Sequence, residues 1–594
     1  MIKWVQKRDG RIVPFHAEKI ADAIFAAAKA VGGEDRRQAE VLAGQVIHLL
    51  QQTVLAQEVP QVEDIQDLVE KVLIEQGHAR TAKAFILYRN QRTRIREAKS
   101  ELMDAVSEIF QEVGSDTEMV STPLGKLQRI AIAASERYSL NNLLPREFAL
   151  AHQRRRIYID RLAHYATSVA AVSIDLRPLL KSAQLVGRIR VPMLQDIDDL
   201  EQAVQASVVA AQSETVEEVL LANIDQVFAE LCRGQQINPS QAETEHFAIR
   251  LLKNINLALT GGSVQPFRVC LSIGSELAST GQCLSRALLM VAKQGLDTLA
   301  APQIVFNLQE GVNLQPEDAG YTVAQLALQV AQERGNPRLV LLPETNNSSV
   351  YFLASGVRLE RAAPVLLART FVNVPRLALE ATSEKDFLAN IDAVLSLVAK
   401  QMVHRSEILT PLQPLDLPLA AAQLCQESAS SSTPWLRKAL LLVVPLGIRE
   451  ALQVARHRFG EALSVTDCEF VNLLYEICEH WRNYYSLNLQ LGIAPSLIVA
   501  RRFFAYDAGA FPLVENLWPG SRAYSCMLGP GAFMSLPGGR LDIWPQLDSV
   551  QEGVVYIVQH DRPICWNCGQ CVEPEGLNCP VCQQPLEEDG HLVL

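Results

Sequence analysis

The sequence lacks any long hydrophobic run. The longest apolar stretch, residues 439–448, contains Pro445 and is too short to cross a bilayer. The start of the sequence also lacks a charged segment followed by an apolar segment, which is the pattern of a secretion signal. These absences argue against a membrane protein and a secreted protein, and we expect a cytoplasmic one.

Cysteine is scarce outside one short segment. Five of the twelve cysteines lie within residues 565–582, and the other seven are scattered singly. A secreted disulfide framework is denser and more even than this. The cysteine pattern therefore indicates a reducing compartment.

Positive charge is in the minority. Lys and Arg number 54 against 66 Asp and Glu, which gives a formal net charge of -12. Such a protein repels a polyanion on average, and this argues against nucleic-acid binding, although local cations can still hold small anions. With 594 residues, 48% of them hydrophobic, the chain is long enough for more than one domain.

The first 96 residues predict a small hairpin followed by four helices. Two short strands flank a turn at Asp9-Gly10, and helical spacing begins near His16. The next two helices are predicted around residues 41–50 and from Val62, and the fourth over residues 79–96. The expected inward-facing residues are Ile20, Ile24, Ala27, Val41, Val46, Leu49, Leu50, Leu68, Val69 and Leu73.

Four ordered blocks in this segment resemble the ATP-cone, the regulatory nucleotide-binding domain of ribonucleotide reductases. They read V-x-K-R-D-G, F-x-x-x-K-I-x-x-A-I, V-E-x-I-Q-D-L-V-E and A-K-A-F-I-L-Y-R. The resemblance implies ATP or dATP as an effector, and a triphosphate needs several cations on one compact frame. The candidate cations are Lys7, Arg8, Lys19 and Lys83. An exposed, solvated helix face is the better interpretation for the run of Arg89, Arg92, Arg94 and Arg96.

The body of the chain alternates predicted strands with predicted helices. Strands are expected at residues 270–274, 304–308 and 337–342, with a helix at residues 321–334. Such alternation favours an α/β fold with a parallel sheet. Residues 193–231 carry helical spacing and are interpreted as paired helices.

Several motifs of the body resemble anaerobic (class III) ribonucleoside-triphosphate reductases. Residues 304–313 follow the family's I-F-x-L-K-E-G-V-N, and residues 373–378 follow N-L-P-R-L-A. The resemblance implies the ten-stranded α/β barrel shared by ribonucleotide reductases and glycyl-radical enzymes. We expect this barrel at residues 97–560, after a mainly helical ATP-cone at 1–96 and before a zinc ribbon at 561–594.

The sequence departs from the family at both expected reactive sulfur positions. Ser355-Gly356-Val357-Arg358 falls where the family has M-G-C-R. In the family that cysteine carries the thiyl radical that takes a hydrogen atom from the ribose, and an isopropyl group cannot form one. A second family cysteine, three residues before I-D-L, is replaced here by Ala171.

Other polar positions also differ. Where the family has H-x-x-G-x-I-H-I-H-D-L, Arg155 stands for the glycine, Tyr158 and Asp160 for two histidines, and Arg161 for the aspartate. The family's radical glycine follows its last cysteine pair, whereas here the only later glycine has none of the R-x-x-G-Y context. These differences predict the absence of catalytic residues.

The cysteine-rich segment predicts a zinc site. Two C-x2-C pairs separated by ten residues suit the tetrahedral preference of zinc. The expected ligands are Cys565, Cys568, Cys579 and Cys582, with Cys571 as a weaker competitor. A closed four-cysteine site is structural, and disulfides or a redox relay are the alternatives.

Three hypotheses follow. The first is a catalytically inactive reductase-like protein that binds adenine nucleotides and has a regulatory or nucleotide-sensing role. Such a protein forms a homodimer or higher oligomer, or has an active reductase as its partner. The second is a divergent reductase that receives its radical from another polypeptide and uses a displaced cysteine; the candidates are Cys270, Cys283, Cys468 and Cys478. The third is a nucleotide-responsive transcription regulator, because ATP-cones joined to zinc ribbons occur in repressors of reductase genes, although the acidic charge disfavours it.

Overall fold

The chain forms two compact units, Met1–Glu108 and Ile109–Leu594. The computed structural model describes residues 4–6, 12–53, 60–89, 103, 106, 109, 123–260, 267–295, 302–334, 336–342, 350–425, 435–460, 467–492, 496–519, 521–525, 555–556, 564–565 and 592–593. The expected division at residue 96 and the separate segment 561–594 stay predictions. In the described part of the chain, no helix combines the length and the apolarity that a membrane span requires.

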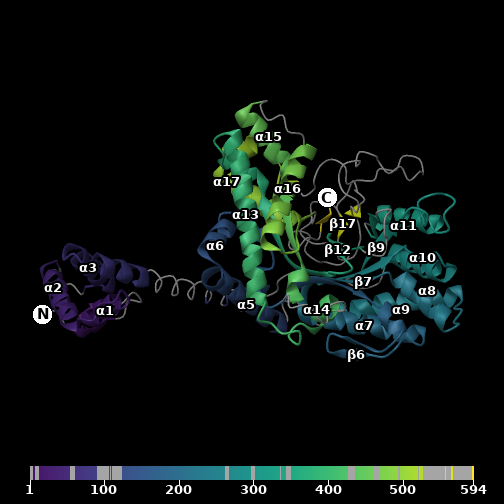
Figure 1. Cartoon of the computed structure of the whole chain (residues 1–594), viewed down its shortest axis with the longest axis horizontal. Helices are drawn as coiled ribbons and strands as arrows, with labels where there is room; N and C mark the ends of the chain where they lie inside the picture. Colours follow the sequence, from purple (N-terminus) through teal and green to yellow (C-terminus); the bar gives the residue numbers. More distant parts are fainter. Residues whose placement is uncertain are drawn as a thin grey trace. The chain divides into compact units, whose positions relative to one another are not determined.

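The N-terminal unit contains the expected hairpin and helices (Figure 1). The antiparallel pair is β1 (Trp4–Gln6) and β2 (Ile12–Pro14), and the helices are α1 (Glu18–Lys29), α2 (Arg36–Thr53), α3 (Val62–Glu75) and a further helix over residues 79–89. Val46, Leu50 and Leu73 are fully buried in the core of this unit. The helical spacing in the sequence was sufficient to predict these elements because each amphipathic stripe is local.

The prediction was wrong for Val41, whose side chain is 62% exposed. The buried stripe of α2 contains Ala39, Leu42, Ala43, Val46 and Leu50. These residues recur at the spacing of an α-helix, whereas Val41 lies between them on the solvent side. Alanines line part of this stripe, and a search for large apolar residues overlooks them.

The interpretation of Arg89 as a solvated residue was also wrong. Its side chain is only 20% exposed, and Nη1 lies 2.6 Å from Asp67 Oδ1 and 2.7 Å from Glu70 Oε1. Burial disfavours the charged guanidinium, but the two carboxylates outweigh this effect and raise the pKa of Arg89. Arg92, Arg94 and Arg96 lie outside the described residues.

The larger unit is built on a ten-stranded sheet with the order β15-β14-β13-β4-β7-β8-β9-β10-β16 and with β3 paired to β13. Its strands are β3 (Ile157–Ile159), β4 (Val169–Asp175), β7 (Thr215–Ala222), β8 (Arg268–Ile273), β9 (Gln303–Leu308), β10 (Arg338–Leu341), β13 (Val365–Asn373), β14 (Leu440–Leu446), β15 (Leu489–Leu491) and β16 (Val555–Tyr556). Strands β4, β7, β8, β9 and β10 run parallel to one another, and so do β13, β14 and β15. The two parallel sets meet antiparallel at β4 and β13.

Helices cover this sheet. They are α5 (Pro123–Tyr138), α6 (Arg146–Gln153), α7 (Ile197–Glu214), α8 (Ile224–Gly234), α9 (Gln241–Thr260), α10 (Ser279–Gln294), α11 (Tyr321–Arg334), α12 (Val374–Glu380), α13 (Glu384–Leu409), α14 (Pro418–Cys425), α15 (Ile448–Phe459), α16 (Asp467–Tyr485), α17 (Leu497–Ala510) and α18 (Pro512–Leu517). In Figure 1, α8 to α11 gather on one side of this unit, and α13 and α15 to α17 gather on another. All residues of β13 and β14 are buried, as expected for parallel strands covered on both faces.

Short pairs and turns complete the unit. The pairs are β5 (Gln184–Val186) with β6 (Ile189–Val191), β11 (Val350–Phe352) with β12 (Arg358–Glu360), and β17 (Ile564–Cys565) with β18 (Leu592–Val593). The helical turns are η1 (Ser139–Leu143), η2 (Leu162–His164), η3 (Arg177–Leu180) and η4 (Trp435–Lys438). The mixed α/β class is confirmed. Closure into a barrel stays a prediction, because β15 and β16 end the strand order without pairing to each other in the described residues.

The interpretation of residues 193–231 as paired helices was wrong in its centre. Strand β7 lies there, between α7 and α8. Its residues Thr215, Val216 and Val219 are β-branched and suit a strand, but a short buried apolar run fits helical spacing equally well. The missed strand matters, because β7 carries two acidic residues of the site described next.

Candidate functional site

The hairpin β11–β12 contains the segment Ser355-Gly356-Val357-Arg358. Its register pairs Val350 with Glu360 and Phe352 with Arg358, so residues 353–357 form its tip. Val357 is 1% exposed and Ala354 is 3% exposed. The tip therefore lies inside the protein, although a hairpin tip usually faces solvent.

Two backbone hydrogen bonds shape the tip. Leu353 N donates to Val357 O at 2.9 Å, and Gly356 N donates to Leu353 O at 2.9 Å. Gly356 has a φ of 88°, in the region that favours glycine because a Cβ atom would clash with the backbone. The Ser355-Gly356-Val357 sequence thus fixes a tight turn that presents Val357 to the interior.

Glu218 of β7 joins the tip to the sheet. Its Oε1 atom accepts a hydrogen bond from Ala354 N at 2.6 Å and another from Cys270 Sγ at 2.8 Å. Glu218 and Cys270 are both 0% exposed. Burial raises the pKa of the Cys270 thiol well above its ordinary value, and the Glu218 carboxylate adds to this effect, so the thiol stays protonated.

Ala171 lies on the face of the sheet that the hairpin covers. Its register partner on β7 is Glu218, and its partner on β13 is Leu366. Paired residues on neighbouring strands point to the same face, and the Glu218 side chain reaches the hairpin. The structure thus brings positions 171 and 357 to the same region of the interior.

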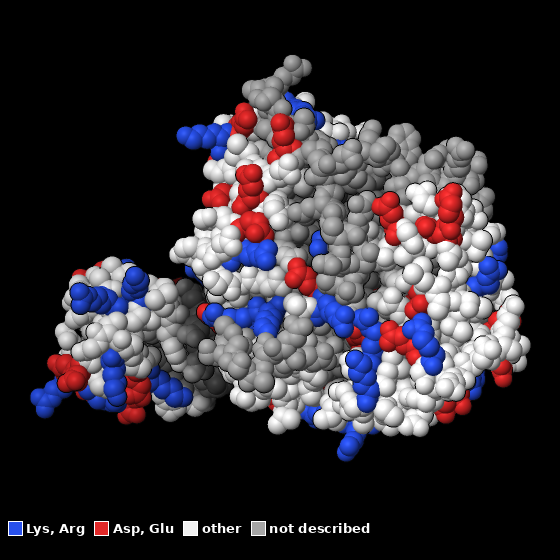
Figure 2. Space-filling view, turned by 45° about the vertical axis from the view of Figure 1, so that its right-hand side comes forward, with Lys and Arg blue, Asp and Glu red and all other residues white. Residues whose placement is uncertain are grey.

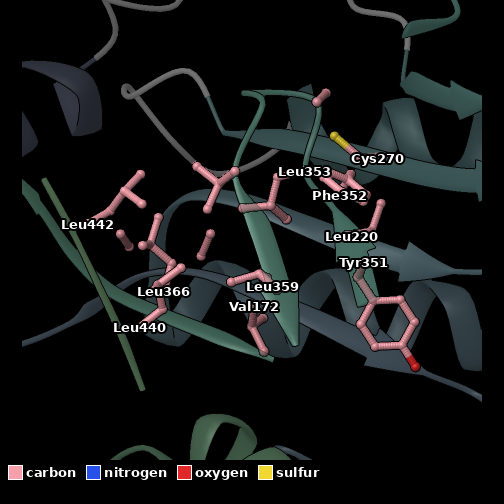
Figure 3. Packing of buried hydrophobic residues seen from close by; sticks show 14 of the residues in the cluster. Val172, Leu220, Cys270, Tyr351, Phe352, Leu353, Leu359, Leu366, Leu440 and Leu442 are labelled. Atoms are coloured by element: carbon pink, nitrogen blue, oxygen red, sulfur yellow. The ribbon is translucent and has the colours of Figure 1, made fainter. Parts of the chain in front are cut away.

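Apolar packing surrounds this region. Figure 3 shows side chains of the hairpin among side chains of the sheet strands β4, β7, β8, β13 and β14. The labelled residues are Tyr351, Phe352, Leu353 and Leu359 of the hairpin and Val172, Leu220, Cys270, Leu366, Leu440 and Leu442 of the sheet. Tyr351 and Leu442 are 4% and 3% exposed, and the other labelled residues are at most 2% exposed. The hairpin is therefore part of the hydrophobic core.

A chain of buried ion pairs lies beside this core. Arg369 Nη2 is 2.7 Å from Asp160 Oδ2 and 2.7 Å from Glu217 Oε1, and Arg268 Nη2 is 2.7 Å from the same Glu217 atom. Burial opposes the ionisation of Asp160, but the positive charges of Arg369 and Arg161 outweigh burial and lower its pKa. Asp160 thus carries a carboxylate that is held ionised.

The Asn373-Val374-Pro375-Arg376 motif begins α12 and ties β13 to α17. Asn373 Nδ2 donates to Asp507 Oδ2 at 2.9 Å and to Arg155 O at 3.0 Å. Arg376 Nη1 lies 2.9 Å from Asp507 Oδ1. In this structure the motif is a packing junction, since Asn373 and Asp507 are both 0% exposed.

The candidate nucleotide-binding cations are only partly described. Lys19 lies at the start of α1 and Lys83 lies in helix 79–89, and both side chains are exposed. Lys7 and Arg8 lie outside the described residues. The phosphate contacts of all four side chains stay predictions.

The expected zinc ligands are mostly outside the described part. Cys565 lies in β17, with Leu592 of β18 as its register partner. Cys568, Cys579 and Cys582 are among the residues that the structure does not describe. Among the residues that it does describe, no group of three or more His, Cys, Asp or Glu is placed to hold a metal ion.

The fold and this geometry agree with comparisons to known proteins. Residues 117–525 match the family described as anaerobic ribonucleoside-triphosphate reductase, which is more than half of the chain. This chain belongs to the anaerobic ribonucleoside-triphosphate reductase family. Residues 3–94 match the ATP cone domain, so this family member carries a nucleotide-regulatory domain.

Relatives of the family are similar over most of their length. The anaerobic ribonucleoside-triphosphate reductases of Haemophilus influenzae and Escherichia coli are each 23% identical, over 571 and 577 residues. These matches cover 86% and 87% of this chain and 80% of each relative. The vitamin B12-dependent ribonucleoside-diphosphate reductase of Thermoplasma acidophilum is 37% identical over 149 residues, which cover 22% of this chain and 19% of that protein.

Solved structures of the anaerobic ribonucleotide reductase from Thermotoga maritima share the fold. The complex with dATP and CTP has a TM-score of 0.53 and 13% identity, and the match covers 74% of this chain and 82% of that one. The structure with glycerol in the active site has a TM-score of 0.54 and 13% identity, covering 83% and 94%. At this identity the likeness shows the fold.

The sequence analysis missed Glu217, Glu218 and Arg369 of this family member. One signal was available, because two adjacent acidic residues interrupt an otherwise apolar run in Thr215–Ala222. Carboxylates in a buried strand need partners, and they therefore mark a site that other segments complete. Those partners lie 51 to 152 residues away in sequence, so no local pattern could identify them.

Proposed function

We propose that this member of the anaerobic ribonucleoside-triphosphate reductase family is catalytically inactive and binds ATP or dATP through its ATP cone in a regulatory or sensing role. The observation that carries the proposal is the side chain at the hairpin tip. Val357 is buried, and it stands in Ser-Gly-Val-Arg, the segment that resembles the family's M-G-C-R with its radical cysteine. Hydrogen-atom abstraction by a thiyl radical requires sulfur there.

The surroundings of Val357 support this proposal. Ala171, at the second position where the resemblance implies a family cysteine, is 0% exposed and cannot supply a thiol. Cys270 is the thiol that the described residues bring to the hairpin, through their shared partner Glu218. Because burial keeps this thiol protonated and its proton is donated to Glu218, Cys270 is better suited to holding the tip than to reacting.

The ATP cone supports the regulatory part. A triphosphate carries several negative charges and needs several cations on one compact frame. Lys19 and Lys83 present unburied ammonium groups on the cone, and Lys7 and Arg8 precede them in the hairpin sequence. We assign phosphate contacts to these four residues.

Calorimetric titration of the full chain with ATP and with dATP tests the regulatory part. We expect binding to both nucleotides, and binding at least about tenfold weaker in the Lys7→Ala, Lys19→Ala double variant. The matched control is Lys29→Ala, Lys71→Ala, which removes two exposed lysines of the same unit. No binding at millimolar nucleotide, or an equal loss in both double variants, would contradict the assignment.

A second candidate function is a divergent reductase that uses Cys270 as a displaced thiol and receives its radical from another polypeptide. The Glu218 contact favours Cys270 over the other cysteines, because it links the thiol to the hairpin tip. An anaerobic assay for deoxyribonucleotide formation separates the candidates. Turnover that is lost in Cys270→Ser would favour the reductase, and no turnover supports the inactive protein.

We further propose a structural zinc at Cys565, Cys568, Cys579 and Cys582, because four thiolates in two C-x2-C pairs suit tetrahedral zinc. We also propose a homodimer or a higher oligomer whose size responds to the nucleotide, with an active reductase as a further partner. Light scattering with ATP and with dATP measures that response. An unchanged molar mass in both nucleotides would contradict it.

A further inference from the structure

Arg405 of α13 is a cationic residue in the interior of the larger unit. It is 1% exposed and is among the largest fully buried side chains of the described residues. Lys and Arg side chains on the surface are solvated, and several adjoin carboxylates on the face that Figure 2 shows. A buried cation loses its solvation, and this is costly unless a counter-charge and hydrogen bonds compensate for the loss.

The contacts of the Arg405 guanidinium compensate for little of this cost. Nη2 donates to the carbonyl oxygen of Ser168 at 3.3 Å, and the guanidinium carbon lies 5.2 Å from the centroid of the Tyr165 ring. The Nε atom is buried and has no hydrogen-bond partner in the described part of the chain. A long bond to a neutral acceptor and an aromatic face therefore stand where a buried arginine ordinarily has a carboxylate.

The carboxylates nearby are engaged with other arginines. Asp160 acts on Arg405 through space, but its Oδ2 atom lies 2.7 Å from Arg369 Nη2, and the charge of Arg161 acts on it as well. Arg369 is also shared with Glu217, at 2.7 Å. Among the residues that the structure describes, no carboxylate forms an ion pair with Arg405. Its positive charge is therefore in excess.

The polar groups around Arg405 are neutral and bind one another. Thr370 Oγ1 donates to Gln401 Oε1 at 2.8 Å, and Gln401 Nε2 donates to the Tyr165 hydroxyl at 3.2 Å. That hydroxyl donates to Gln401 O at 3.1 Å and lies 3.0 Å from His404 Nδ1. Burial lowers the pKa of His404, so its imidazole is neutral at pH 7. This chain of hydrogen bonds supplies no counter-charge.

Arg405 keeps its own charge at neutral pH. Burial lowers the pKa of its guanidinium to about 10, and the negative charges of Tyr165 and Asp160 act in the opposite direction. The guanidinium is therefore protonated at pH 7. Deprotonation does not explain the missing partner.

We infer that the Arg405 guanidinium binds a small monovalent anion such as chloride. An anion supplies both the acceptor that Nε lacks and the counter-charge, whereas a water molecule supplies only the acceptor. Ser168, which Nη2 contacts, is half-buried beside exposed Thr167, so this end of the guanidinium lies near solvent. The bound anion fastens α13 to the start of β4. The site lies in the larger unit and does not depend on the ATP cone.

Thermal unfolding of the full chain at constant ionic strength tests the inference. Sodium chloride replaces sodium gluconate in steps, and an anion that binds the folded protein raises the unfolding temperature of the larger unit. For a unit of this size we expect a rise of about 1 °C for each tenfold increase in chloride above its Kd. Arg405→Met should lose this rise, and Lys400→Met, at an exposed position of the same helix, should retain it. Equal chloride responses of the two variants would overturn the inference.

Bromide locates the ion without any substitution. It is similar to chloride in size and charge and scatters X-rays anomalously, so crystals of the unmodified full chain grown in sodium bromide should show an anomalous peak beside Arg405 Nε. A water molecule or no density there would overturn the inference, whether or not Arg405→Met folds. No nucleotide takes part in either measurement, so a failure here leaves the proposed binding of ATP untouched.

Inorganic phosphate tests the size and charge of the ligand. It is larger than chloride, and a side chain that is 1% exposed leaves little room for it. We expect no rise in the unfolding temperature that depends on both phosphate and Arg405. A rise in phosphate that exceeds the rise in chloride, and that Arg405→Met abolishes, would overturn the assignment to a small monovalent anion.

Discussion

Glu218 Oε1 lies 2.6 Å from the backbone nitrogen of Ala354. This contact joins strand β7 of the sheet to the tip of the β11–β12 hairpin, 136 residues later in the chain. A hydrogen bond to a charged, buried acceptor is among the stronger contacts in proteins. The position of Val357 therefore depends on a residue outside the hairpin.

Glu218→Ala should loosen the hairpin tip. The substitution leaves Ala354 N and the Cys270 thiol without their acceptor, and each hydrogen bond to a charged group contributes about 1.5–3 kcal/mol. Hydrogen exchange of residues 353–357 should speed up, and the thermal unfolding temperature should fall. Glu245→Ala, at an exposed position of α9, is the control and should leave both unchanged. If exchange at the tip is the same in both variants, the contact does not hold the hairpin.

Cys270 should resist alkylation in the folded protein. It is 0% exposed, and burial beside Glu218 raises the pKa of its thiol well above the ordinary value, so little thiolate forms between pH 7 and about 9. Exposed Cys283 provides an internal reference. Iodoacetamide labelling followed by mass spectrometry should find modified Cys283 in the native protein and modified Cys270 only after unfolding. Equal native labelling rates would show that Cys270 is accessible.

His152 should make the stability of the larger unit depend on pH. Its pKa in the folded protein is about 4, against 6.5 for an ordinary histidine. As the pH falls from 6.5 towards 4, the unfolded chain binds a proton on this residue and the folded chain does not. The free energy of unfolding should therefore fall by up to about 3 kcal/mol as the pH drops through this window. Above pH 6.5 the stabilisation that comes from His152 is fully present.

Thermal unfolding across that pH window checks the expectation. His152→Gln retains a side-chain acceptor for Ile159 N but does not titrate. The difference in unfolding free energy between the unmodified protein and this variant therefore isolates the effect of the histidine. Parallel pH profiles for the two proteins would assign the pH dependence to other groups.

Arg155→Gly should stabilise the folded protein, because glycine adopts a φ of 58° without strain. We expect a gain of about 1 kcal/mol in the free energy of unfolding. Arg154→Gly is the adjacent control, since Arg154 has a φ of -79° and gains nothing from glycine. Chemical denaturation measures both variants. A loss of stability in Arg155→Gly would show that its side chain contributes to folding.

Zinc should be present at one ion per chain, bound by the two C-x2-C pairs. Elemental analysis of purified protein should show the zinc content falling in Cys568→Ser and in Cys582→Ser, because a tetrahedral thiolate site fails when a ligand is lost. Cys571→Ser, between the two pairs, should retain zinc. If Cys571→Ser loses zinc while Cys568→Ser and Cys582→Ser keep it, Cys571 is a ligand and the proposed set is wrong.

Sequence patterns predicted the elements whose signal is local. The helices of the N-terminal unit, together with β8, β9 and β10, follow from apolar spacing over a few residues. Strand β7 was missed because its short apolar run suits a helix as well as a strand. Only its parallel pairing with β4 and β8, which are distant in sequence, decides between the two.

The candidate site was predictable in outline and not in its contacts. The resemblance singled out Ser355-Gly356-Val357-Arg358, but the hairpin itself was not predicted, and nothing near it in sequence identifies Glu218 or Cys270 as partners. The left-handed conformation of Arg155 also escapes a propensity argument, because arginine rarely adopts it. The glycine that the family pattern has at this position was the one available hint.

The hairpin lies in sequence between β10 and β13, the last strand of one parallel set and the first of the other. Its apolar residues belong to the hydrophobic core beside strands of both sets, so packing constrains them. Valine is apolar like a buried cysteine and larger by only about one methyl group, so a core can accommodate the exchange at position 357 with modest repacking. Under the proposed function, a lineage can therefore abandon radical chemistry by point substitution and still inherit a stable body joined to an ATP cone.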